Sequence, residues 1–183
     1  MNVLDVIMLL GLVTGVAIGF VRGLVQQAMG LLSIYVSMVV GVWAHNLFGD
    51  GFKSVMPALS WPAARFLGFL TALIIVLNAL GFVTRDIERN AEWIKKIPPI
   101  VNQVGGLTLG FATAAFWLGV LSMALSVIGH APWVGAEEAG RTLVILVNDS
   151  ILAYVFRYAF WLGLHTVSPW IPGGLPDILT SPF

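Results

Sequence analysis

The stretch Gly11-Leu-Val-Thr-Gly15-Val-Ala-Ile-Gly19-Phe-Val-Arg22-Gly23 decides the fold, because glycine recurs in it at every fourth position. In a helix, residues four apart lie on one face, so Gly11, Gly15 and Gly19 would form a stripe without side chains. Such a helix is poor in water, where each interior glycine costs about 0.8 to 1 kcal/mol relative to alanine. In a bilayer the same stripe lets a second helix approach closely. The stretch therefore predicts a transmembrane packing face that ends at Arg22 on the membrane surface, before a turn at Gly23.

The composition indicates a membrane protein. Of the 183 residues, 58% are hydrophobic and 10% are charged, and the mean hydropathy is +0.94. A soluble domain has about 25% charged residues, so too few charges remain here to cover a soluble surface. The net charge is zero, which gives no electrostatic basis for binding nucleic acid. Cysteine is absent, which excludes disulfides and thiolate metal sites.

The apolar residues divide into four segments that are each long enough to cross a membrane, for which a helix needs about 20 residues. The first two segments meet at Arg22-Gly23, where headgroups can solvate the charge. Residues 46–62 mix glycine, proline and charge, which predicts a loop. The charged residues 85–96 are expected to extend the third helix until Pro98 ends it. The predicted spans are residues 3–21, 24–48, 63–84 and 104–129.

The predicted fold class is all-α, a polytopic bundle of membrane helices. Residues 1–141 form its four-helix transmembrane domain, and residues 142–183 form a C-terminal helix with an irregular tail. The C-terminal helix either lies in the membrane interface or forms a fifth span, in which Asp149 and Arg157 would need partners. Neither its length nor its periodicity decides between these two alternatives.

The distribution of basic residues predicts the orientation. With four spans, Arg22 and the basic residues of the segment 85–96 share one side of the membrane. The positive-inside rule puts that side in the cytoplasm. The loop 85–99 is then cytoplasmic and the N-terminus extracytoplasmic.

No motif for catalysis, for a cofactor or for a metal appears in the sequence. The histidines lack the spacing of metal ligands, and the chain has neither a Gly-x-Ser-x-Gly motif nor a phosphate-binding loop. We therefore expect no enzymatic activity. Gln26, Asn78 and Asp149 are the residues that would line a polar route, although polar residues within membranes more often bridge neighbouring helices.

The fourth span repeats the glycine pattern of the first, with small residues at Gly106, Gly110 and Ala114. These positions align with Gly15, Gly19 and Gly23 in the same order. The alignment suggests an internal duplication of inverted orientation, a device of transporter folds. Glycine-rich membrane helices also resemble one another by composition alone.

The order of these features resembles the colicin V production protein family of bacterial inner-membrane proteins. The matching features are Asp5, the motif Gly19-Phe-Val-Arg22-Gly23-Leu-Val, the charged segment after the third span, and Asn102-Gln-Val-Gly-Gly106-Leu-Thr-Leu-Gly110. The resemblance covers residues 1–129 well and is looser beyond them. It implies a multi-pass inner-membrane protein whose loss affects the production or export of a peptide toxin and envelope homeostasis.

The chain departs from the family pattern where the family usually carries charge. Asn102-Gln103 stands in place of an aspartate and an arginine, and Gln27 stands near the usual position of an acid. Thr113-Ala114 occupies the position of a frequent second Arg-Gly pair. These departures argue against a mechanism in this chain that needs an ion pair there.

Three functions follow as hypotheses. The first is a non-enzymatic module in the lipid bilayer that packs through its glycine faces with a second copy or with an export or envelope membrane protein. The alternative is a small transporter or channel built on the degenerate inverted repeat. A membrane-bound regulator that binds a cytosolic partner through residues 85–96 is the third.

Overall fold

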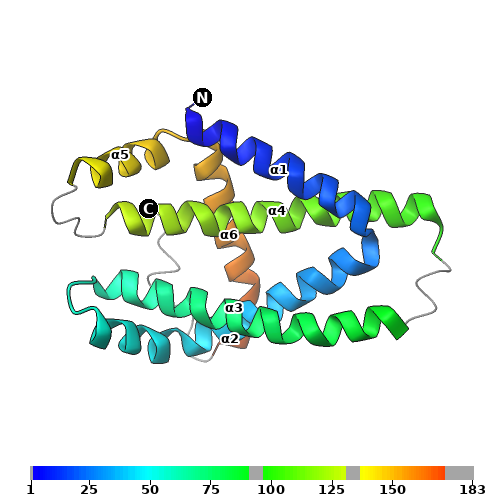
Figure 1. The fold of residues 1–183 in the computed structure, drawn as a ribbon, viewed down its shortest axis with the longest axis horizontal. Coiled ribbons are helices and arrows are strands. Elements are labelled where there is room, and N and C mark those ends of the chain that lie inside the picture. Colours follow the sequence, from blue (N-terminus) through cyan, green and yellow to red (C-terminus); the bar gives the residue numbers. More distant parts are fainter. Residues whose placement is uncertain (1, 91–96, 131–136, 172–183) are drawn as a thin grey trace.

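The computed structural model describes residues 2–90, 97–130 and 137–171, and all regular secondary structure within these ranges is helical (Figure 1). The helices are α1 (Val3–Arg22), α2 (Leu24–Val55), α3 (Trp61–Asn90), α4 (Pro99–Gly129), α5 (Glu137–Asn148) and α6 (Ile151–Val167), and a 3-10 turn, Ser168–Trp170, follows α6. Helices α1 and α2, the part of α3 up to Arg85, and α4 are long and apolar enough to cross a membrane. The predicted all-α fold and its four long apolar helices are therefore confirmed.

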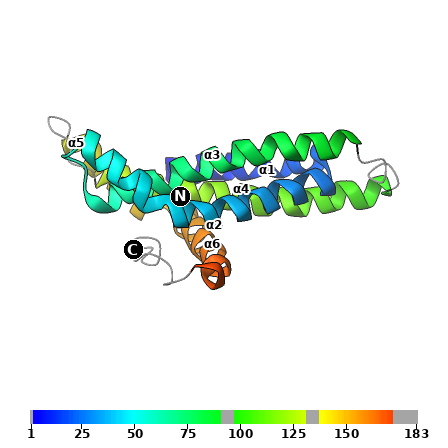
Figure 2. The same cartoon turned by 90° about the horizontal axis from the view of Figure 1, so that it is seen from below.

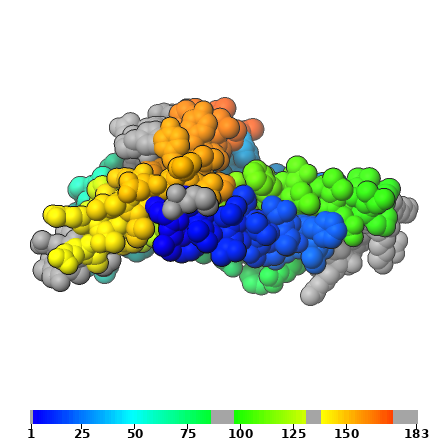
Figure 3. All heavy atoms as spheres, turned by 90° about the horizontal axis from the view of Figure 1, so that it is seen from above, coloured from blue at the N-terminus to red at the C-terminus, as the bar shows by residue number. Residues whose placement is uncertain are grey.

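Helices α1 and α4 lie side by side and run in opposite directions (Figures 1 and 3). A Cβ atom added to Gly110 would lie 2.7 Å from the Cα atom of Gly19, and one added to Gly106 would lie 2.6 Å from the Cα atom of Gly23. Carbon atoms in contact are normally about 3.5 to 4.0 Å apart, so these positions have no room for a side chain. The two glycine-rich stretches of the sequence thus pack against each other within one chain.

The same contact continues toward the N-terminus of α1. A Cβ atom on Gly15 would clash with the Ala114 side chain, and one on Gly11 would lie 3.1 Å from the Leu118 Cδ2 atom. At the other end Gly23, with a φ angle of 83°, ends α1 and precedes α2. The turn predicted at Gly23 is confirmed, because only glycine adopts that backbone conformation without strain.

Glycines also lie at two further helix contacts. A Cβ atom on Gly68 of α3 would lie 2.6 Å from the Gly49 nitrogen of α2, and one on Gly119 of α4 would lie 2.6 Å from the Phe160 Cβ atom of α6. Helix α6 crosses the long helices and projects to one side of them (Figure 2). Its buried side chains complete a core shared by α2, α3, α4 and α6.

The loop predicted over residues 46–62 is wrong for most of its length. Helix α2 continues to Val55, and only residues 56–60 connect it to α3. Gly49 lies within α2, where its missing side chain permits the close approach of Gly68 in α3. The connection itself is held by Lys53, whose Nζ atom donates to the carbonyl of Pro57 over 2.7 Å and to that of Leu59.

The C-terminal region also differs from the expected single helix that begins at residue 142. Helix α5 already begins at Glu137, and α5 and α6 meet at an angle of 76°. The break is at Ser150, whose hydroxyl accepts a hydrogen bond from the Ala153 amide and so caps α6. A bent pair of this kind is compatible with one broken span, so the structure leaves both predicted alternatives open.

A buried carboxylate holds this bend against α1. The Asp5 side chain is fully buried, and its Oδ1 atom accepts hydrogen bonds from the Ser150 hydroxyl (2.7 Å) and the Leu152 amide (3.1 Å). Its Oδ2 atom accepts a hydrogen bond from the backbone amide of Asn2, which closes a capping box at the start of α1. Asp5 therefore caps both its own helix and α6.

The charged segment after the third span continues α3 as expected, as far as Asn90. Residues 91–96 lie outside the described part of the chain. Helix α4 begins at Pro99, five residues before the predicted start of the fourth span at residue 104.

We predict that Gly19→Ala lowers the free energy of unfolding by about 1 to 3 kcal/mol, the typical cost of overpacking a close contact. The matched control is Gly51→Ala, because a Cβ atom at Gly51 meets no other atom within 4 Å. The control should be neutral or stabilising by up to about 1 kcal/mol, since alanine favours the helix. Unfolding of the purified protein in mixed micelles measures both, and equal losses would contradict the α1–α4 contact.

Candidate functional site

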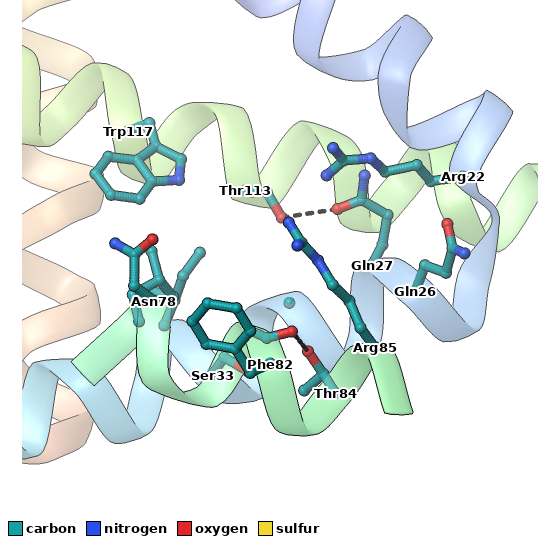
Figure 4. Close-up of a pocket in the computed structure, with 14 residues that line it drawn as sticks. Arg22, Gln26, Gln27, Ser33, Asn78, Phe82, Thr84, Arg85, Thr113 and Trp117 are labelled. Atoms are coloured by element: carbon teal, nitrogen blue, oxygen red, sulfur yellow. Dashed lines mark hydrogen bonds between the residues drawn. The ribbon is translucent and has the colours of Figure 1, made fainter. Parts of the chain in front are cut away.

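A cleft of about 340 Å³ opens between α2, α3 and α4, next to the end of α1 (Figure 4). Its polar side chains are Arg22, Gln26, Gln27, Ser33, Asn78, Thr84, Arg85 and Thr113. The turn at Gly23 brings Arg22, the last residue of α1, next to the first turn of α2. The cleft therefore collects polar groups from all four long helices at one end of the bundle.

Gln27 and Thr113 join α2 to α4 in the wall of the cleft. The Gln27 side chain is buried. The Thr113 hydroxyl donates to the Leu109 carbonyl of its own helix over 2.9 Å and, more weakly, to the Gln27 Oε1 atom over 3.3 Å. Thr113 stands where the family pattern often has an arginine, and Gln27 lies near the usual position of an acid. In this chain the contact between α2 and α4 at these positions is made by neutral groups.

Arg22 and Arg85 make one part of the cleft cationic. Both are exposed, and they extend from α1 and α3 toward the part of the cleft where Gln27 and Thr113 lie (Figure 4). Within the described part of the chain, no carboxylate lines the cleft and neither arginine has an ion-pair partner.

The rest of the cleft is apolar and open. Its apolar walls are formed by Ile34, Leu77, Phe82 and Trp117. Two glycines, Gly30 and Gly81, complete the lining, and a Cβ atom on either would meet no other atom within 4 Å. These glycines make the cleft wider, in contrast to those of the α1–α4 contact, which allow two backbones to touch.

The structure brings together two of the three residues predicted for a polar route. Gln26 and Asn78 both line the cleft. Asp149 is exposed where α5 meets α6 and is not among the lining residues. Of the predicted packing residues, Arg22 lines the cleft, and the others lie in the α1–α4 contact: Gly11, Gly15, Gly19, Gly23, Gly106, Gly110 and Ala114. Within the described ranges, no group of three metal-ligating side chains forms.

Sequence reasoning missed the role of Asn102. Its Oδ1 atom accepts a hydrogen bond from the Leu24 amide over 2.9 Å, so a residue of α4 caps the start of α2. The predicted fourth span began at residue 104, so Asn102 stood outside the expected helix, whereas in the structure it lies in the first turn of α4. Arg85 and Thr113 were also missed as cleft residues, since each belongs to a different helix.

The long apolar helices, the glycine contacts between them and the polar cleft at one end together define a multi-pass helical membrane protein. The chain belongs to the colicin V production protein family, whose model matches residues 4–164. The matched range includes Asp5, the whole cleft and the bend between α5 and α6. No curated protein and no solved structure matches the chain significantly.

We predict that Asn102→Ala lowers the free energy of unfolding by about 0.5 to 2 kcal/mol, because the Leu24 amide loses its cap. Asn102→Asp should retain stability, since a carboxylate also accepts this bond and is favoured at a helix N-terminus. Gln103→Ala, at the exposed neighbouring position, is the control and should have little effect. Denaturation in mixed micelles compares the three variants, and an Asn102→Ala protein as stable as the control would refute the cap.

Proposed function

We propose that the chain is a non-enzymatic accessory protein of the bacterial inner membrane that acts in the production or export of a peptide toxin and in envelope homeostasis. Family membership supports this role, and the cleft is the observation that carries it. Polar groups in a membrane are costly unless they are paired. Asp5 and Asn102 are used in helix caps, whereas Arg22 and Arg85 face an open cleft. The cleft is therefore the proposed working surface.

The proposed orientation puts the cleft at the cytoplasmic face. Arg22 and Arg85 line the same cleft, at the end of the bundle where α1 and α3 finish (Figure 1). Lys53 and Arg65 lie near the Trp61 ring at the other end of α3. Under the positive-inside rule the loop 85–99 is cytoplasmic and the N-terminus extracytoplasmic.

The proposed partners, besides the bilayer, are a second copy or an export or envelope membrane protein. The glycine faces of α1 and α4 cover each other within the chain, so they are not open to such a partner. A partner would instead contact the cleft or the apolar side chains that α1 to α4 present outward. Among these are Leu10, Leu32, Ile75 and Val104.

A small transporter is the second candidate, favoured by the symmetry of the α1–α4 contact. In the repeat alignment Gly15 corresponds to Gly106 and Gly19 to Gly110. Gly15 contacts Gly110, and Gly19 contacts Gly106, so exchanging the two stretches maps the contact onto itself. Inverted repeats of transporters are related by a pseudo-two-fold axis of this kind. Liposome flux that depends on Gln26 and Asn78 would support transport over an accessory role.

We predict that Gly30→Leu abolishes toxin release when the gene replaces the wild-type copy in a producing strain. The leucine would fill the cleft without disturbing a helix contact, because no atom lies within 4 Å of its Cβ position. Gly51→Leu has equal space outside the cleft and should restore release fully. Both proteins are quantified in membrane fractions by immunoblotting, and toxin is measured in the medium. Normal release by Gly30→Leu at equal protein level would refute the cleft as the working surface.

A further inference from the structure

We propose that the cleft binds the phosphate group of an anionic glycerophospholipid, with the headgroup between Arg22 and Arg85. The inference rests on the proposed role of the cleft as the working surface and names the ligand of that surface. It follows from four properties of the site: its charge, its hydrogen-bond donors, its apolar wall and its depth.

The two arginines of the described lining favour an anion. Arg22 and Arg85 come from different helices and face the same cleft, yet no carboxylate among its described lining residues balances them (Figure 4). Two like charges beside a low-dielectric membrane repel each other more strongly than in water. A guanidinium group matches a phosphate with two parallel hydrogen bonds, so a phosphate between the arginines would relieve the repulsion.

Neutral donors stand beside the arginines. The Gln27 Oε1 atom lies on the α4 side of the cleft, 3.3 Å from the Thr113 hydroxyl, and the amide NH₂ group of the same side chain supplies donors for a ligand. Gln26 adds an exposed amide to the same lining. Together these groups offer donors to the several oxygen atoms of a phosphate.

The apolar wall favours a lipid over a free phosphate ion. Ile34, Leu77 and Phe82 line the same cleft as the arginines, and Phe82 is 72% exposed. Exposed apolar residues continue along α3 from there, with Ile74 at 50% and Val83 at 55%. A headgroup in the cleft would therefore have a path along α3 for its acyl chains, which a soluble anion does not need.

The size and depth of the cleft also agree with a headgroup. Its 340 Å³ equals roughly eleven water molecules at about 30 Å³ each, enough for a headgroup but not for two acyl chains. Arg22 ends the apolar helix α1, which places it at the level of the lipid phosphates if α1 spans the membrane. Basic residues at that level attract anionic lipids of the cytoplasmic leaflet.

Lipid binding to the purified full chain in detergent tests the proposal, by native mass spectrometry with phosphatidylglycerol and phosphatidylcholine as probes. We expect phosphatidylglycerol to bind more tightly. Arg22→Gln and Arg85→Gln should each weaken its binding about tenfold through loss of a charge-assisted hydrogen bond. Gly30→Leu should weaken it at least as much by filling the cleft. Arg141→Gln, at an exposed arginine of α5, and Gly51→Leu are the controls and should bind as the wild type does.

Two results would overturn the proposal. One is equal binding of the two lipids, or binding that the cleft variants leave unchanged. The other is displacement of phosphatidylglycerol by millimolar inorganic phosphate, which would assign the site to a soluble phosphate.

If lipid binding fails while Gly30→Leu still blocks toxin release, only the proposed lipid ligand is wrong, and the cleft remains the working surface. Cleft-dependent lipid binding with normal release by Gly30→Leu would contradict the proposed function instead.

Discussion

The backbone contact between α1 and α4 is the constraint on which the rest of the structure depends. Within a bilayer the hydrophobic effect does not drive helices together, so association depends on close packing and on hydrogen bonds. Gly19 and Gly110 supply the packing, because neither has a side chain to hold the backbones apart. Gly23, where the chain turns, lies against Gly106 at the end of the same contact. Arg22 and Gln27 consequently meet Thr113 of α4 at the cleft.

Two polar side chains supplement the glycine contacts by capping helices other than their own. Asp5 of α1 accepts from the amide of Leu152 in α6, and Asn102 of α4 accepts from the amide of Leu24 in α2. A helix end that is left without partners is costly where water is scarce. Each cap therefore ties a helix start to a glycine-rich helix, and the two glycine-rich helices are tied to each other. The cleft lies where α2 leaves this framework.

Local patterns in the sequence predicted the parts of the fold that depend on local chemistry. The apolar segments, the glycine stripes and the turn at Gly23 are features of single stretches, and the structure contains all of them. Gly49 was misread as part of a loop because a glycine in a turn and a glycine in a close helix contact look alike in one sequence. Only the position of Gly68 on the neighbouring helix distinguishes the two cases. The sequence did not predict the cleft for the same reason, because Arg85 and Thr113 come to line one cavity with Gln27 only after the helices pack.

Cross-linking between α1 and α4 in native membranes tests the central contact most directly, because the chain contains no cysteine of its own. Cysteines at Gly11 and Leu118 should form a cross-link within one chain upon oxidation, because the two positions face each other: a Cβ atom at Gly11 would lie 3.1 Å from the Leu118 Cδ2 atom. A pair at Gly11 and the exposed Thr108 should not, because Thr108 lies nearly three helical turns from Leu118 on α4. The account predicts a cross-linked product with the mass of a monomer. A covalent dimer, or equal cross-linking of both pairs, would contradict it.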